Sequence, residues 1–436
     1  MSVLRYPRLE IVLFVLLAVF LLAGAASVPF HPDETSWLYQ SRDLEALFRA
    51  PASLPWRTET PPSQDLTYRL LNAPLAKYVL GAARLAAGYP AETVSTDWDW
   101  TQSWDENTRA SALPSPGLLA AGRVASTLLL VSSLVPIYFA GRALGGRASG
   151  LGAALLLATN ALALLHGRRS MAEGALILGV SLALLGLFYA DRHPWLAGIA
   201  SGLAFAAKTS AGVWIPLGWV GAAWTTETSR TGAPQTLRRI AAYSASAFVT
   251  IVLLFPVLWA EPLGATRAML DARQDLVDSQ IAEFGEAMPE TVLATPAERM
   301  VSMLAQLFIA PPQFAEAANY TTQTADAEAS YLRTIGHDVL RGFVGGAAIL
   351  IAAILGLVLG IRVEARAGPA VRRIVLLAFL ATLVQAIALI VFVPLSFQRY
   401  VVPLVPLVCL WAGHGIAGSI TAVNRNRRAR GPAAAT

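Results

Sequence analysis

The stretch Phe30-His31-Pro32-Asp33-Glu34-Thr35-Ser36-Trp37 sets two neighbouring carboxylates directly after an apolar run, residues 9–28. A run of about twenty apolar residues is long enough to cross a lipid bilayer as a helix. The chain therefore places Asp33 and Glu34 at a fixed depth, just outside the membrane. Adjacent carboxylates repel each other and resist dehydration, so holding them there requires a structural or a chemical use.

The composition indicates a membrane protein. Of the 436 residues, 55% are apolar and 14% are charged, whereas a soluble domain has roughly 25% charged residues. The net charge of +5 does not indicate a nucleic-acid partner, because the arginines lie mostly between apolar runs. The single cysteine, Cys409, excludes a disulfide within the chain and argues against a cysteine-based zinc site.

Ten apolar runs predict an all-α polytopic membrane protein with about ten transmembrane helices. Residues 195–226 predict either two short spans or one long span kinked at Pro216. The first run is longer than a usual signal peptide, which remains the alternative for it. The runs are residues 9–28, 120–141, 148–166, 171–190, 195–211, 212–226, 240–260, 342–361, 374–395 and 400–420.

The distribution of arginine predicts the orientation. Sixteen arginines fall in the segments that are inside if the N-terminus is cytoplasmic, so the positive-inside rule places both termini in the cytoplasm. Residues 29–119 and 261–341 then face outward. The first outer segment predicts amphipathic juxtamembrane helices at 36–50 and 74–87, and the second predicts a helix at 271–286 and a cap or lid.

The acidic residues near the outer face have two interpretations each. Asp33 and Glu34 either act chemically or cap the helix that follows Pro32. His31 with Asp33 is a weak metal-binding pattern. Glu173 lies about one turn inside a span, where an acid needs a partner or a function. It either pairs locally with the preceding arginines or supplies a further carboxylate to a site.

Among the cations on the outer side, where the charge rule disfavours them, five are candidate ligands: Lys77, Arg168, Arg169, Lys208 and Arg399. Each alone suits a snorkelling anchor. Together they suit a phosphate or pyrophosphate on a lipid, because arginine binds phosphate through paired hydrogen bonds and lysine acts as a point charge. Five tryptophans of the first outer segment, Trp37, Trp56, Trp98, Trp100 and Trp104, suit either an interfacial belt or a sugar-stacking wall.

Several motifs are absent from the sequence. It contains no P-loop, no H-E-x-x-H pair and no G-x-G-x-x-G after a strand. A soluble nucleotide-sugar domain is therefore missing, and any activated donor must come from the membrane.

These motifs together resemble the GT-C superfamily of polyprenyl-phosphate-sugar transferases, in particular the protein O-mannosyltransferases and lipid A aminoarabinose transferases. The chain departs from the family pattern at Ala73, where a second proline is usual, and at Glu173, where aspartate is common. The matching segments are Pro32-Asp33-Glu34, Ala73 to Tyr78, Gly122-Arg123-Val124, Tyr138 to Gly150, Arg169 to Glu173, Gly198 to Lys208 and Arg399 to Pro406.

The resemblance implies an inverting transfer from a polyprenyl-phosphate-linked sugar to an acceptor hydroxyl at the outer membrane face. Asp33 is the expected base, with Glu34 and Glu173 as further catalytic carboxylates. Tyr400 joins the five cations as an expected donor-phosphate ligand, and His31, Trp37 and Tyr78 are expected substrate contacts. No cofactor is required, since the cations can supply the electrostatic stabilisation; a divalent metal on Asp33 or Glu173 is the alternative.

The expected partners are the lipid-linked donor, membrane lipid and an acceptor protein, lipid or glycan. The expected location is a bacterial plasma membrane. The expected units are a catalytic membrane module at 1–260, a second outer loop at 261–341, C-terminal spans at 342–423 and a basic tail at 424–436. The alternatives are a secondary transporter, which tends to show repeated halves, and a non-catalytic lipid- or glycan-binding protein.

Overall fold

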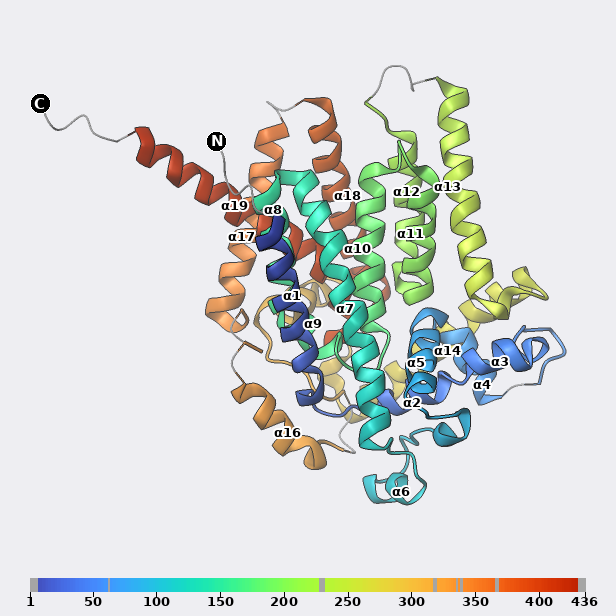
Figure 1. Ribbon diagram of the computed structural model, residues 1–436. Coiled ribbons are helices and arrows are strands. Elements are labelled where there is room, and N and C mark those ends of the chain that lie inside the picture. Colours follow the sequence, from blue (N-terminus) through green and yellow to red (C-terminus); the bar gives the residue numbers. More distant parts are fainter. Residues whose placement is uncertain are drawn as a thin grey trace, which may run out of the picture.

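The computed structural model describes residues 7–61, 63–226, 232–316, 320–334, 336–337, 340–364 and 368–429. Regular structure in these residues is helical, apart from one isolated β-bridge between Val292 and Leu395. Long helices run side by side in one bundle, and the shorter helices of two loops gather at one of its ends (Figure 1). Within the described part of the chain, six helices are long and apolar enough to cross a membrane. The chain is therefore an all-α polytopic membrane protein, as the sequence predicts.

Each of the ten predicted runs contains a bundle helix. Within the bundle, α10 packs against α7 and α11, α11 packs against α13, and α8 joins α7 to α19, which packs on α17. The helices are α1 (Pro7–Ala23), α7 (Pro116–Gly145), α8 (Arg147–Thr159), α10 (Glu173–Tyr189), α11 (Pro194–Ala207), α12 (Trp214–Ala223), α13 (Ala233–Leu254), α17 (Gly342–Glu364), α18 (Pro369–Phe392) and α19 (Val405–Ala429).

Two of the runs are interrupted. The run 148–166 divides at Asn160, whose side chain accepts hydrogen bonds from the first amides of α9 (Ala161–His166). The run 195–226 forms two short helices, and the break lies at Lys208 and the 3-10 turn Thr209–Val213. The prediction of Pro216 as the breaker is wrong, because this proline lies in the first turn of α12, where no intrahelical donor is lost.

The first outer segment forms α2 (Pro32–Gln40), α3 (Asp43–Arg49), α4 (Gln64–Leu71), α5 (Pro74–Ala86) and α6 (Trp104–Arg109). Residues 74–87 form the predicted helix, which proline starts at a position that needs no amide donor. The single helix predicted at 36–50 is instead two helices. Ser41 ends α2 by donating its hydroxyl to the Leu38 carbonyl, and most of α2 is buried rather than lying on the surface.

The second outer segment forms α14 (Pro262–Ala287), α15 (Pro296–Leu304), the π-helical turn Ala305–Ile309 and α16 (Thr321–Arg333). The helix predicted at 271–286 lies within α14. Between the π-turn and α16, residues 311–316 enter the protein, and Phe314 and Glu316 are buried. The predicted basic tail continues α19 to Ala429, and its remainder lies outside the described residues.

Short 3-10 turns connect the longer elements. They are Ala25–Ser27, Pro51–Ser53, Ala91–Val94, Pro256–Leu258, Pro289–Thr291 and Gln398–Leu404, in addition to the turn after Lys208. The turn Gln398–Leu404 matters most for the site, because it directly precedes α19 and carries Arg399 and Tyr400.

Candidate active site

The start of α2 is fixed by His31 rather than by Asp33. The Asp33 amide donates to His31 Nδ1 at 3.1 Å, and the His31 amide donates to the Glu34 carboxylate at 3.2 Å, which together form a capping box. Helix capping therefore uses the side chains of His31 and Glu34. The Asp33 carboxylate is left to face other elements.

Glu34 is held by a buried arginine. Arg123 of α7 donates two hydrogen bonds to it, at 2.8 and 2.7 Å, and the Ser170 amide donates a third at 2.9 Å. Burial raises the pKa of the Glu34 carboxyl, but Arg123, Arg169 and the Ser170 amide together lower it below its usual value. All of the polar neighbours of Glu34 stabilise its charged form and join α2 to α7 and to the turn before α10.

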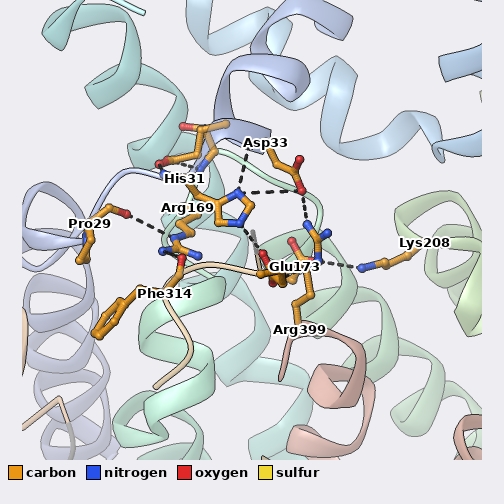
Figure 2. Close-up of polar contacts among 11 residues, drawn as sticks. Pro29, His31, Asp33, Arg169, Glu173, Lys208, Phe314 and Arg399 are labelled. Carbon is orange, nitrogen blue, oxygen red and sulfur yellow. Dashed lines mark hydrogen bonds and ion pairs between the residues drawn. The ribbon is translucent and has the colours of Figure 1, made fainter. Parts of the chain in front are cut away.

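Asp33 forms an ion pair with Arg399, which comes from the other end of the sequence (Figure 2). Arg399 Nε lies 3.5 Å from Glu316 Oε1, and Glu316 Oε2 lies 2.5 Å from His31 Nε2. Burial raises the pKa of both carboxyls, but the charges of Arg399 and His31 and the hydrogen bonds that they donate together lower both pKa values below their usual range. One guanidinium is thus shared by two carboxylates.

A second ion pair lies beside the first. Lys208 Nζ lies 2.7 Å from Glu173 Oε1, and both side chains point toward the Arg399 region (Figure 2). The Tyr400 ring lies near both cations, with its centroid 5.8 Å from Lys208 Nζ and 5.8 Å from the Arg399 guanidinium carbon. Glu173 therefore pairs with Lys208, not with the adjacent arginines that the sequence offers as local partners.

Arg169 is buried and ties two loops together. It donates to the carbonyl of Phe314 at 2.8 Å and to that of Pro29 at 3.4 Å. These carbonyls belong to the segment that carries Glu316 and to the segment that leads into α2. Arg169 therefore lies against the backbone on both sides of the Asp33–Arg399–Glu316 group.

The remaining predicted residues have other surroundings. Lys77 donates to the Tyr68 carbonyl at 2.9 Å and lies 3.8 Å from Asp43, and burial lowers its pKa to about 8. Arg168 donates to the carbonyls of Leu21 and Phe20. The Tyr78 hydroxyl donates to the Leu254 carbonyl, and Trp37 packs in an apolar cluster with helix α5. The structure does not bring these four residues into the group around Asp33.

Three of the five tryptophans gather next to His31. Trp98 packs edge to face with Trp100 and with Trp104, and Tyr320 contacts both Trp98 and the His31 ring. Trp37 and Trp56 lie in separate clusters. An aromatic wall of the kind that the sequence suggests therefore contains only three of the five tryptophans.

Sequence reasoning missed two buried residues at the site, Glu316 and His166. His166 ends α9 with neither ring nitrogen bonded within the described residues, and the charges of Arg169, Glu316 and Arg399 act on its ring. The Tyr320 hydroxyl and Glu173 Oε2 are likewise buried and unbonded there. Buried polar atoms without partners are rare and mark places where water or a ligand binds. The sequence gives no signal that separates these residues from the other acids and histidines.

The metal alternative finds no ready site. Within the described residues, no group of three or more His, Cys, Asp or Glu side chains is placed to hold a metal ion.

The chain is similar in fold to proteins of known structure. No protein-family model and no curated protein matches the chain. Among solved structures, ArnT from Cupriavidus metallidurans bound to undecaprenyl phosphate matches with a TM-score of 0.52 and 14% identity, over 96% of this chain and 64% of that chain. The Archaeoglobus fulgidus oligosaccharyltransferase AglB, in complex with an inhibitory peptide and a dolichol-phosphate, matches with a TM-score of 0.51 and 10% identity, over 98% of this chain and 53% of that chain.

This chain has a GT-C-type fold. The Pmt1-Pmt2 protein O-mannosyltransferase complex of S. cerevisiae, bound to its sugar donor, also matches, but its TM-score of 0.43 is too low to carry an argument. The GT-C-type chain spans between half and two thirds of the length of ArnT and AglB. The similarity concerns the fold, and the activity is argued from the site.

Proposed function

We propose that this GT-C-type chain is a membrane glycosyltransferase that moves a sugar from a polyprenyl-phosphate donor to an acceptor hydroxyl at the outer face of a bacterial plasma membrane. The observation that carries the proposal is the Arg399 guanidinium shared by Asp33 and Glu316, with the Lys208–Glu173 pair beside it. The proposal combines a base, a set of cations and unbonded polar atoms at one end of a membrane bundle. The solved structures of similar fold contain an undecaprenyl phosphate and a dolichol-phosphate.

The proposed reaction is one displacement. The acceptor oxygen attacks the anomeric carbon, the bond from that carbon to the phosphate oxygen breaks, and polyprenyl phosphate leaves with the electron pair. The acceptor proton passes to the Asp33 carboxylate. A single attack from the side opposite the leaving group inverts the anomeric configuration. General-base assistance of this kind contributes roughly 10²–10⁴-fold to the rate.

Cations stabilise the leaving phosphate, whose negative charge grows at the transition state. We assign this role to Arg399 and Lys208, which pair with Asp33 and Glu173 and have Tyr400 beside them. We also assign it to Arg169, whose charge acts on Glu316 and His166. Lys77 and Arg168 lie outside this group and bond to other parts of the protein, so their proposed roles are structural. Glu34 is proposed to hold α2, and thus Asp33, in position.

Donor binding also switches on the base in this proposal. Before the donor binds, Arg399 keeps the Asp33 pKa low, and a carboxylate of low pKa is a weak base. A phosphate that binds Arg399 displaces Glu316 and loosens the Asp33 pair, which raises the proton affinity of Asp33. The Tyr320 hydroxyl and His166 can then bond to the incoming substrate.

Asp33→Asn tests the proposal. Asparagine keeps the size of the side chain but does not accept a proton at neutral pH, so turnover should fall by roughly 10²–10⁴-fold while donor binding persists. The assay follows transfer of a labelled sugar and release of polyprenyl phosphate by the purified protein. Asp105→Asn, at an exposed position of the first outer segment, is the matched control. Wild-type turnover in Asp33→Asn would remove the assignment, and solute uptake by proteoliposomes would favour the transporter.

A further inference from the structure

A cavity of about 320 Å³ lies in the first outer segment. Its walls come from the end of α2, from α3 and from α4, and include Tyr39, Arg42, Asp43, Tyr68 and Arg69. Its volume lies at the lower end of the range for small-molecule sites, roughly 300–1,000 Å³. Neither Asp33 nor Arg399 lines it, so it is separate from the group described above.

The charges on the cavity wall balance one another. Three arginines, Arg42, Arg49 and Arg69, face three acids, Asp43, Glu45 and Asp65. Arg42 lies 3.0 Å from Asp65, and Arg69 donates two hydrogen bonds to Asp43, at 2.9 and 2.8 Å. Glu45 forms an ion pair with Arg84 from behind the wall. Arg49 is exposed and forms no ion pair within the described residues. A phosphate or a carboxylate ligand at Arg42 or Arg69 would have to break the pairs of these arginines, and an apolar lipid tail would leave the pairs unsolvated.

The wall suits a ligand with many hydroxyl groups. Each hydroxyl both donates and accepts hydrogen bonds, and here fixed arginine donors alternate with carboxylate acceptors. The rings of Tyr39 and Tyr68 pack edge to face with centroids 6.3 Å apart, and the Arg42 guanidinium lies 3.7 Å over the Tyr39 ring. Ion pairs and ring contacts hold these groups in place, so little ordering is needed when a ligand binds.

The cavity and the proposed base share one helix. Asp33 lies in the first turn of α2, and Tyr39 and Gln40 end that helix and line the cavity. Six residues of α-helix rise about 9 Å. A short chain of sugar rings in the cavity would therefore lie along the same helix as Asp33.

We infer that this cavity binds a neutral saccharide. The inference rests on the proposed function, because that function supplies two sources of such a ligand, the sugar of the lipid-linked donor and the glycan portion of the acceptor. Both sources present the same hydroxyl-bearing rings to Tyr39, Arg42 and Arg69. A peptide or an apolar lipid acceptor would not present such a set of hydroxyl groups to the charged side chains of this wall.

Filling the cavity tests the inference without removing an ion pair. Ala46 of α3 lines the cavity, so Ala46→Phe places a ring in it. Ala86 of α5 is exposed and does not line it, so Ala86→Phe is the matched control. The probes are neutral di- and trisaccharides of mannose, galactose and arabinose, with inorganic phosphate as the charged comparison. Binding to the purified full-length protein is measured by saturation-transfer NMR.

The expected result is that at least one saccharide binds the wild type and Ala86→Phe, while Ala46→Phe weakens that binding tenfold or more. Inorganic phosphate should bind all three proteins alike. Ala91, in the turn Ala91–Val94, also lines the cavity, so Ala91→Phe replaces Ala46→Phe if that variant does not fold. Absence of saccharide binding to the wild type, or equal binding to the filled variant, would overturn the inference.

Two further measurements identify the source of the saccharide. If the cavity holds the donor sugar, Ala46→Phe weakens binding of the intact donor but not of polyprenyl phosphate. If it holds the acceptor, donor binding is unchanged and the KM for a saccharide acceptor rises. Direct binding does not depend on turnover, so Asp33→Asn should bind the saccharide as the wild type does. A failure of the proposed function is thus distinguished from a failure of this inference.

Discussion

Arg399 is the residue through which the proposed site is controlled. Its guanidinium contacts Asp33 and Glu316 at once, and Glu316 also contacts His31. The ion pairs draw together residues from the first outer segment, the second outer segment and the start of the last span. In the proposed reaction a lipid phosphate must compete with these carboxylates for the same cation.

Glu316→Gln should therefore tighten donor binding. Removing this charge leaves Arg399 paired with one carboxylate instead of two. The donor phosphate then has one carboxylate fewer to displace from the guanidinium. If the ion pair between Arg399 and Glu316 opposes phosphate binding by about 1.4 kcal/mol, its removal tightens the Kd roughly tenfold. Polyprenyl-phosphate binding to the purified protein measures the effect. Glu290→Gln, exposed on the same outer segment, is the control. Unchanged or weaker donor binding in Glu316→Gln would contradict the proposal that the phosphate displaces Glu316 from Arg399.

The sequence could identify only those site residues whose charge is unusual at their predicted position near the bilayer. Glu173, Lys208 and Arg399 stand out because charges are costly near a bilayer, and the structure brings them together around Asp33. Glu316 lies in a polar segment, where an acidic residue is not unusual in the sequence. It joins the group around Asp33 only because residues 311–316 enter the protein. The charges of Lys77 and Arg168 are unusual in the same way, but buried backbone carbonyls satisfy them.

Helix α2 shows how an element positions a reactive side chain. Pro32 and the His31–Glu34 capping box begin the helix, and the Glu34–Arg123 pair fastens it to α7. The sequence predicted a helix here but not its end at Ser41, because that end depends on Arg84 of α5, which donates to the Ser41 hydroxyl. Pairs between distant segments cannot be read from local pattern alone.

Glu34→Gln should lower the stability of the protein, because Glu34 holds α2 in position and does not take part in the proposed proton transfer. Both partners are buried, and removing one charge of a buried pair leaves the other uncompensated, at a cost of about 3–5 kcal/mol. Thermal unfolding in detergent should show a lower Tm for Glu34→Gln. Replacing Arg123 with methionine in the same variant should recover part of the loss. Glu59→Gln, at an exposed position, should melt like the wild type. Loss of turnover at unchanged Tm would instead make Glu34 a catalytic residue.

At the scale of the whole molecule, the loops divide between the two ends of the bundle. Helices α2 to α6, α14 and α16 gather at one end, while α1 begins and α19 ends at the other (Figure 1). The spans could be predicted because apolar runs of this length have few other folds. The route by which two distant loops meet at one end could not, since it depends on tertiary contacts such as that of α14 with α4.

Cysteine labelling in intact cells should confirm the orientation. Cys409, the single cysteine in the sequence, is buried, so a new cysteine reports without background. A membrane-impermeant maleimide should label Asp105→Cys, in the first outer segment, and should label Gly368→Cys only after the cells are opened. Both positions are exposed in the structure. Labelling of Gly368→Cys in intact cells would reverse the proposed topology.

The sharing of Arg399 also imposes a sequence of events on a reaction with two substrates. If the exchange operates as proposed, the lipid must arrive first, since an acceptor that arrives alone meets an Asp33 still held by the guanidinium. The same contact then completes the cycle. When the spent lipid departs, Arg399 returns to Asp33 and expels the proton taken from the acceptor, so each turnover ends with the enzyme reset and unable to activate water while it waits.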